Sequence, residues 1–142
     1  MKEGSVRQTV IINKPAHEVF DFTINPENTP KWVDGVVREQ TNESPTKLGT
    51  VYRNQGHDGS WSEFEITAFE ADSMFEMTKK GDNTHVQYTF MPVDNSHCEL
   101  EYCVWVDAGE IDERFSKENI KDILQKLKNV IEENNEGKSI GL

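Results

Sequence analysis

The stretch VIINKPAHEVFDFTINPENTPKW, residues 10–32, decides the fold that this chain is expected to adopt. Its β-branched beginning predicts a strand over residues 6–12, which the Asn-Lys-Pro sequence then ends. An amphipathic helix is expected to begin near Pro15, where a missing N–H costs nothing, and to end near Ile24. A second Asn-Pro sequence opens another short helix that reaches Trp32. The chain therefore begins with one strand followed directly by two short helices.

Six further strands follow, and each is bounded by turn residues. Phe64 and Ile66 alternate with Glu63 and Glu65, and this alternation is typical of an antiparallel sheet with one buried and one solvated face. The strands are expected at residues 36–41, 49–55, 61–70, 74–79, 85–93 and 98–106. This order of elements predicts an α+β fold, in which a curved antiparallel sheet wraps around a final helix and leaves a cavity between them.

The final helix is expected to begin after Ser116 and to end near Asn134. Its apolar residues recur at the spacing of one helix face, and at 1.5 Å per residue it is about 28 Å long, enough to cross the sheet. Residues 135–142 are expected to form a frayed tail. Residues 1–142 are therefore expected to form one domain with its core at residues 6–134.

The chain carries 26 acidic and 15 basic residues, a formal net charge of −11. This charge opposes binding to nucleic acid, and no apolar run approaches the roughly 20 residues that span a bilayer. Cys98 and Cys103 point to opposite faces of one expected strand, so they cannot easily form a disulfide. Reduced thiols and the lack of an apparent export signal indicate the cytoplasm. The four histidines show no metal-ligand spacing, and neither a metal nor a cofactor is expected.

Several phrases resemble one family. They are INKPAHEVFDFTINPENTPKW at residues 12–32, LGTVYRNQG at 48–56, FEITAFEADSMFEM at 64–77 and CELEYCVWV at 98–106. Together they resemble the START-like, or SRPBCC, superfamily, which includes the birch-pollen-allergen-like and the polyketide cyclase/dehydrase-like proteins. The resemblance implies a helix-grip fold, in which a seven-stranded curved antiparallel sheet surrounds a long C-terminal helix. The chain departs from the family at Ala71-Asp72, where Pro-Pro is usual.

The resemblance implies a cavity that holds a hydrophobic or aromatic small molecule, such as a lipid or a polyketide. Inward-facing apolar and aromatic side chains would line it. The expected cavity residues are Trp32, Tyr52, Phe64, Ile66, Phe75, Met77, Tyr88, Phe90, Leu100, Tyr102, Leu124 and Leu127.

Two other functions stay open. The first is a polyketide-cyclase-like enzyme, in which Tyr52, Asn54, Tyr88 or Tyr102 would transfer protons, and its mark would be an inward ionisable group with a strongly shifted pKa. The second is a protein-interaction module like the chaperone-ATPase activators, with a filled interior and an exposed apolar patch. The sequence assigns no catalytic residue, because the glutamates of the strands alternate onto the solvated face and no histidine shows an orienting partner. The apolar pattern also does not fix whether Tyr52 and Asn54 or Arg53 and Gln55 face inward, and an inward Arg53 could bind a carboxylate.

Overall fold

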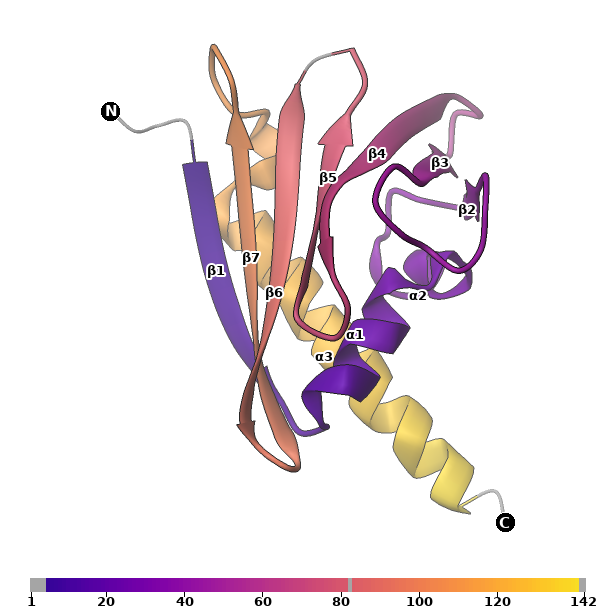
Figure 1. The fold of residues 1–142 in the computed structure, drawn as a ribbon, viewed down its shortest axis with the longest axis vertical. Coiled ribbons are helices and arrows are strands. Elements are labelled where there is room, and N and C mark those ends of the chain that lie inside the picture. The colour runs from indigo at the N-terminus through magenta and orange to yellow at the C-terminus, as the bar shows by residue number, and fades with distance from the viewer. Residues whose placement is uncertain (1–4, 82, 141–142) are drawn as a thin grey trace.

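The computed structural model describes residues 5–81 and 83–140 and has the expected helix-grip fold (Figure 1). Seven strands form one antiparallel sheet in the order β1-β7-β6-β5-β4-β3-β2. The elements are β1 (Ser5–Ile12), α1 (Ala16–Ile24), η1 (Pro26–Asn28), α2 (Thr29–Trp32), β2 (Arg38–Thr41), β3 (Val51–Gln55), β4 (Trp61–Glu70), β5 (Met74–Lys79), β6 (Thr84–Asp94), β7 (His97–Val106), η2 (Glu113–Phe115) and α3 (Lys117–Ile140).

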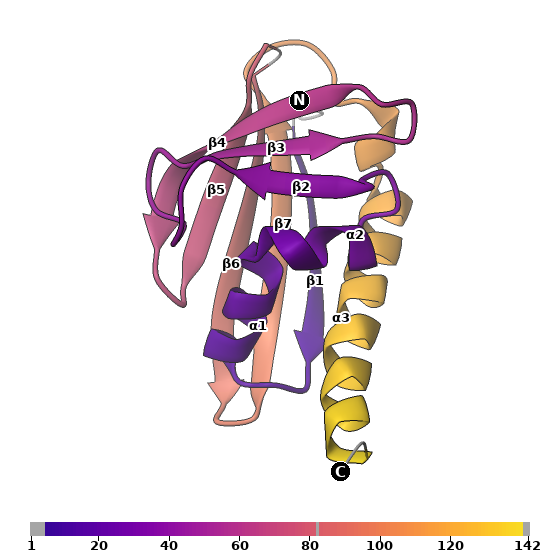
Figure 2. The same cartoon turned by 90° about the vertical axis from the view of Figure 1, so that its right-hand side faces the viewer.

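The sheet is strongly bent. Figure 2 shows β5, β6 and β7 running along the molecule, whereas β2, β3 and β4 cross over one end of it. The register of β4 against β5 shifts between Ile66 and Ala68, as at a β-bulge. Part of the bend arises there, because a β-bulge increases the local twist of a strand. The shift also changes which side chains of β4 face inward, so that Phe69 packs edge-on against Phe20 with ring centroids 6.0 Å apart. The inward side chains are therefore at even-numbered positions up to Ile66 and at an odd-numbered position, Phe69, after the shift.

Helix α3 packs against β1 and against the two short helices, on the concave side of the sheet. Ile120, Leu124, Leu127 and Ile131 are buried along its apolar stripe, as the sequence predicts. Burial of an aliphatic side chain of this size contributes about 1.5–3 kcal/mol relative to its exposure. The stripe is therefore a main source of stability for the fold.

The structure refines several boundaries. Strands β4 and β5 lie where the sequence predicts them, whereas β2 and β3 begin later, at Arg38 and Val51. The second short helix consists of two pieces, η1 and α2, and the Asn25 side chain accepts a hydrogen bond from the Glu27 N–H at 3.0 Å. Helix α3 continues to Ile140, beyond its expected end.

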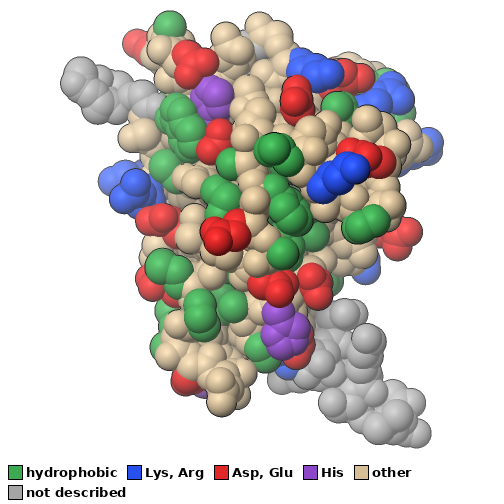
Figure 3. Space-filling view, in the orientation of Figure 1, with side chains coloured by type: hydrophobic (Ala, Val, Ile, Leu, Met, Phe, Trp, Pro, Cys, Tyr) green, Lys and Arg blue, Asp and Glu red, His purple; other side chains and the backbone are tan. Residues whose placement is uncertain are grey.

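Both cysteines are free thiols on opposite faces of β7, as expected. Acidic side chains are scattered over the convex face of the sheet (Figure 3). Among the described residues, no helix combines the length and the apolar character needed to cross a membrane.

Candidate functional site

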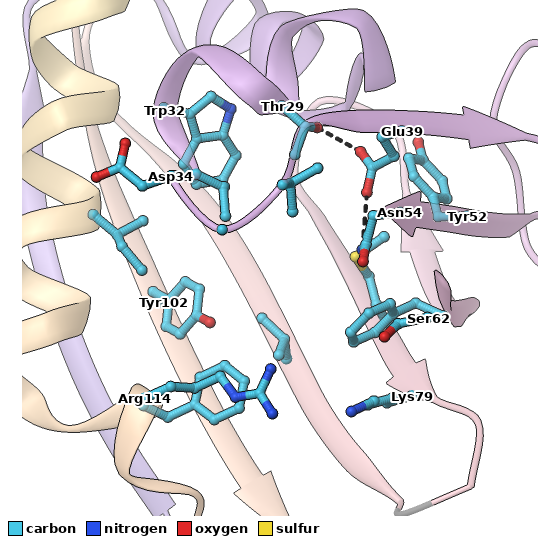
Figure 4. Close-up of a pocket in the computed structure, with 18 of the residues that line it drawn as sticks. Thr29, Trp32, Asp34, Glu39, Tyr52, Asn54, Ser62, Lys79, Tyr102 and Arg114 are labelled. Atoms are coloured by element: carbon cyan, nitrogen blue, oxygen red, sulfur yellow. Dashed lines mark hydrogen bonds between the residues drawn. The ribbon is translucent and has the colours of Figure 1, made fainter. Parts of the chain in front are cut away.

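A cavity of about 550 Å³ lies on the concave side of the sheet (Figure 4). Its wall includes side chains of α1, α2, η2 and α3 and of every strand except β1. Of the residues expected at such a cavity, those that line it are Trp32, Tyr52, Phe64, Phe75, Met77, Tyr88 and Tyr102.

The other expected cavity residues lie elsewhere. Phe90 and Leu100 are buried in the packed core, and so are Ile66, Leu124 and Leu127. In front of Phe90 the Phe20 ring packs edge-on, with centroids 5.2 Å apart, so this part of the interior is filled. Near its beginning, α3 instead lines the cavity with three other side chains, those of Asn119, Asp122 and Ile123. The cavity therefore lies nearer the beginning of α3 than the void expected against Leu124 or Leu127.

The aromatic rings of the wall support one another. Tyr88 stacks on Phe75 with centroids 4.7 Å apart, and it meets Tyr102 edge-on at 5.1 Å and Trp32 edge-on at 6.3 Å. Aromatic pairs in these geometries are worth about 0.5–1.5 kcal/mol beyond the burial of their area. The wall is therefore a fixed surface and not a set of loosely held side chains.

Strand β3 places Tyr52 and Asn54 on the cavity side. Arg53 points the other way, where its guanidinium lies over the Trp61 ring at 4.6 Å and its Nε is 3.5 Å from Glu63. This resolves the register that the sequence left open. An inward arginine that would bind a carboxylate is therefore excluded at position 53.

The three tyrosines differ in what their hydroxyls can do. The Tyr52 hydroxyl donates to the Ile24 carbonyl at 2.6 Å and lies 2.7 Å from the Thr46 hydroxyl, so it ties β3 to the end of α1. Burial raises the pKa of Tyr52 to about 12. Burial also raises the pKa of Tyr88 and of Tyr102, but their hydroxyls make no hydrogen bond to any described residue. Figure 4 shows the Tyr102 hydroxyl pointing into the cavity.

Two further polar atoms of the wall have no partner within residues 5–81 and 83–140. They are the Trp32 indole nitrogen and the Thr23 hydroxyl, and both are buried. Buried polar groups in folded proteins are almost always hydrogen-bonded, to protein or to another molecule. Both atoms have almost no accessible surface, so the donors that a molecule in the cavity can reach are the two tyrosine hydroxyls.

Glu39 on β2 is the residue that the sequence reasoning missed. Its carboxylate accepts hydrogen bonds from the Thr29 hydroxyl and, at 3.5 Å, from the Asn54 side-chain amide. Burial raises the pKa of Glu39 to about 7, although both hydrogen bonds act in the opposite direction. No apolar pattern in β2 points to it. In the structure Glu39 pairs with Asn54 across the strands, and both side chains line the cavity.

The charged side chains of the wall lie at different places. In Figure 4, Lys79 and Arg114 lie at the opposite end of the view from Glu39. Arg114 pairs with Asp112 at 3.3 Å, and Asp34 pairs with Lys126. Glu39, in contrast, forms no ion pair with any described lysine or arginine.

His85 has the partners that a functional histidine needs, but it lies outside the cavity. Its ring nitrogens lie 2.9 Å from the Asp107 carboxylate and 2.9 Å from the Thr78 hydroxyl, and its ring stacks on Trp105 at 5.1 Å. In β6, His85 alternates with the buried Thr84 and Val86, which places it on the convex face. Within the described ranges, no group of three or more His, Cys, Asp or Glu side chains is arranged to hold a metal ion.

Solved structures share this fold at low sequence identity. The di-domain ARO/CYC StfQ from the steffimycin biosynthetic pathway matches with a TM-score of 0.73 and 15% identity, over 94% of this chain and 47% of StfQ. A norcoclaurine synthase point mutant from Thalictrum, in complex with a transition-state analogue, matches with a TM-score of 0.67 and 7% identity, over 92% and 95% of the two chains. The Aha1 dimer from Colwellia psychrerythraea matches with a TM-score of 0.67 and 12% identity, over 89% and 95%.

No curated protein matches the sequence. A family model does: residues 3–132 match the family described as polyketide cyclase/dehydrase and lipid transport. This match covers all the residues that line the cavity, and it covers α3 as far as Glu132. The resemblance read from the sequence is confirmed, and the chain belongs to the polyketide cyclase/dehydrase and lipid transport family.

Proposed function

We propose that this protein binds a hydrophobic or aromatic small molecule inside the cavity. The observation that carries the proposal is the cavity itself, whose volume of about 550 Å³ is that of a small-ligand pocket. Its aromatic wall and the pliable Met77 side chain suit a flat apolar body. Removal of that body from water would drive binding, at about 25 cal/mol per Å² before the costs of association. The family and the cyclase-like neighbours support a hydrophobic ligand-binding fold.

The ligand also carries at least one hydrogen-bond acceptor. Tyr88 and Tyr102 line the cavity, and their hydroxyls make no hydrogen bond to any described residue. A ligand oxygen that accepts one of these bonds removes the cost of an unsatisfied buried donor, which is about 1–3 kcal/mol. A pure hydrocarbon leaves the buried donors without a partner. The cavity wall therefore favours a ketone, an ester or a phenol over a hydrocarbon.

A protein-interaction module fits the structure less well. Its mark would be a filled interior with a continuous apolar surface patch. Here the interior holds a cavity, and the exposed Ile11 and Met91 on the convex face are separated by Glu99, which pairs with both across the strands.

The test is a titration with N-phenyl-1-naphthylamine, a neutral dye whose emission rises in an apolar site. We expect saturable binding by the native protein, and a clear loss of affinity in Tyr88→Trp, because the larger indole fills the cavity. Gln87→Trp is the matched control, since Gln87 lies beside Tyr88 on the opposite face of β6. Equal binding by native protein and Tyr88→Trp, or no binding by any of them, contradicts the proposal.

A further inference from the structure

Glu39 is an acidic side chain in an aromatic cavity, and its contacts do not neutralise it. The hydroxyl of Thr29 and the amide of Asn54 each donate to one of its oxygens, so the carboxyl group is held in one orientation. Hydrogen bonds of this kind orient a carboxylate but do not replace the water that burial removes. The result is a carboxyl whose pKa burial raises to about 7, so both protonation states are populated at neutral pH.

The groups that face Glu39 from the neighbouring elements are mostly neutral. They are Thr29 from α2, Tyr52 and Asn54 from β3, and Tyr88 from β6, where the negative charge of Glu39 contributes to the raised pKa of both tyrosines. The other charged groups of the cavity wall are Asp34, Lys79, Arg114 and Asp122. Glu39 thus shares one cavity with tyrosine hydroxyls that keep their protons at neutral pH.

This combination places a proton acceptor and hydrogen-bond donors around one space. A base is most effective when its pKa lies near the working pH. A hydroxyl whose pKa is raised stays a donor, and donors that are fixed before the reaction stabilise an oxygen on which negative charge develops. Among the described residues, the Tyr88 and Tyr102 hydroxyls bond to nothing else, so they are available to a ligand oxygen.

We propose that Glu39 is a catalytic residue that removes a proton from the carbon next to a ketone carbonyl of the bound ligand, with Tyr88 or Tyr102 donating to the carbonyl oxygen. The C–H bond breaks, and its proton bonds to a Glu39 oxygen. The electron pair of the broken C–H bond forms a carbon–carbon double bond. The π electron pair of the C=O bond moves to the carbonyl oxygen, which accepts a hydrogen bond from the tyrosine hydroxyl. Return of the proton from Glu39 restores the ketone, so no oxidant or other reactant is needed. This inference rests on the proposed binding function and adds a reaction to it.

The test uses 6-propionyl-2-(dimethylamino)naphthalene, whose fluorescence reports binding and whose CH₂ group next to the carbonyl can exchange its hydrogens. The probe is incubated with the protein in deuterated buffer, and its gain of deuterium is followed by mass spectrometry. We expect exchange above the buffer background that rises with pH through about 7, as Glu39 loses its proton. Glu39→Gln should bind the probe but lose about 100-fold or more of the protein-dependent exchange, which is the usual contribution of a general base.

Two variants separate this role from a structural one. Thr29→Val removes a hydrogen bond that lowers the pKa of Glu39, so its exchange profile should move to higher pH. Glu63→Gln removes an exposed carboxylate that pairs with Arg53 on the other face of the sheet, and it should leave exchange unchanged.

The outcomes distinguish the two proposals. A probe that binds without exchange above background, or an equal exchange rate in native protein and Glu39→Gln, overturns the catalytic role and leaves the binding function standing. If neither this probe nor N-phenyl-1-naphthylamine binds, the binding function fails, and the catalytic role fails with it.

Discussion

The two sides of the sheet differ in how their inner faces are filled. On the side of β1, β7 and β6, Ile12, Leu100 and Val104 are fully buried against apolar neighbours. On the side of β2 and β3, inward positions carry Glu39 and Asn54, and the cavity lies against them. The same sheet therefore supplies a packed core near β1 and polar cavity residues near β2 and β3, whereas Tyr88 and Tyr102 extend the aromatic part of the cavity wall onto β6 and β7.

This difference has a physical basis in hydrogen bonding. Polar side chains at inward positions must keep their hydrogen bonds, so they cannot close the space as a leucine or phenylalanine does. Tyr52 holds the end of α1 through the Ile24 carbonyl, and Glu39 holds α2 through Thr29. These bonds connect the short helices to the cavity side of the sheet, and they involve the same residues that give the cavity its chemistry.

The largest effect is expected on the packed side. Leu127 is fully buried and does not border the cavity, so Leu127→Ala should lower the free energy of unfolding by about 2–5 kcal/mol. Urea denaturation measures this loss. Leu48→Ala is the control, because Leu48 is 63% exposed and should change stability little. A loss below about 0.5 kcal/mol for Leu127→Ala would contradict a packed stripe.

A smaller effect is expected on the cavity side, and it depends on pH. Burial raises the pKa of Glu39 from 4.5 to about 7 in the folded protein. The folded state therefore binds more protons than the unfolded state between these values, and stability should fall as pH rises through this window. The loss should reach about 1–3 kcal/mol above pH 7. Glu39→Gln removes this titration, so the difference in stability between variant and native protein should grow in favour of the variant from pH 4.5 to 8.

Urea midpoints at several pH values measure this difference. Identical pH profiles for the native protein and Glu39→Gln would show that the Glu39 carboxyl is solvated. The cavity side would then resemble the outer surface of the sheet and not a site of its own.

The sequence predicts the strands that carry an apolar pattern better than it predicts β2, which carries Glu39. Strands β4 and β5 are marked by alternating apolar residues between turn residues, and their predicted bounds agree with the structure. Strand β2 reads Arg-Glu-Gln-Thr, which has no apolar phase, so nothing local indicates that Glu39 faces inward. Its raised pKa depends on how α2 and β3 exclude water, and that is a property of the assembled fold.

The apolar pattern also could not separate a filled space from an empty one. Ile123, Leu124 and Leu127 belong to one stripe of α3, yet only Ile123 borders the cavity. The distinction depends on where α3 crosses the bent sheet and on the Phe20 ring that fills the core beside Phe90. Neither can be read from the spacing of residues along the helix.

The most direct test of the account is a methyl NMR titration with N-phenyl-1-naphthylamine on methionine-labelled protein. Met77 lines the cavity, whereas Met91 lies on the convex face and is 42% exposed. We predict that the dye shifts the Met77 methyl signal in a saturable manner and leaves the Met91 signal in place. A shift of Met91 with Met77 unchanged, or no shift of either, would contradict a ligand-binding cavity inside the sheet.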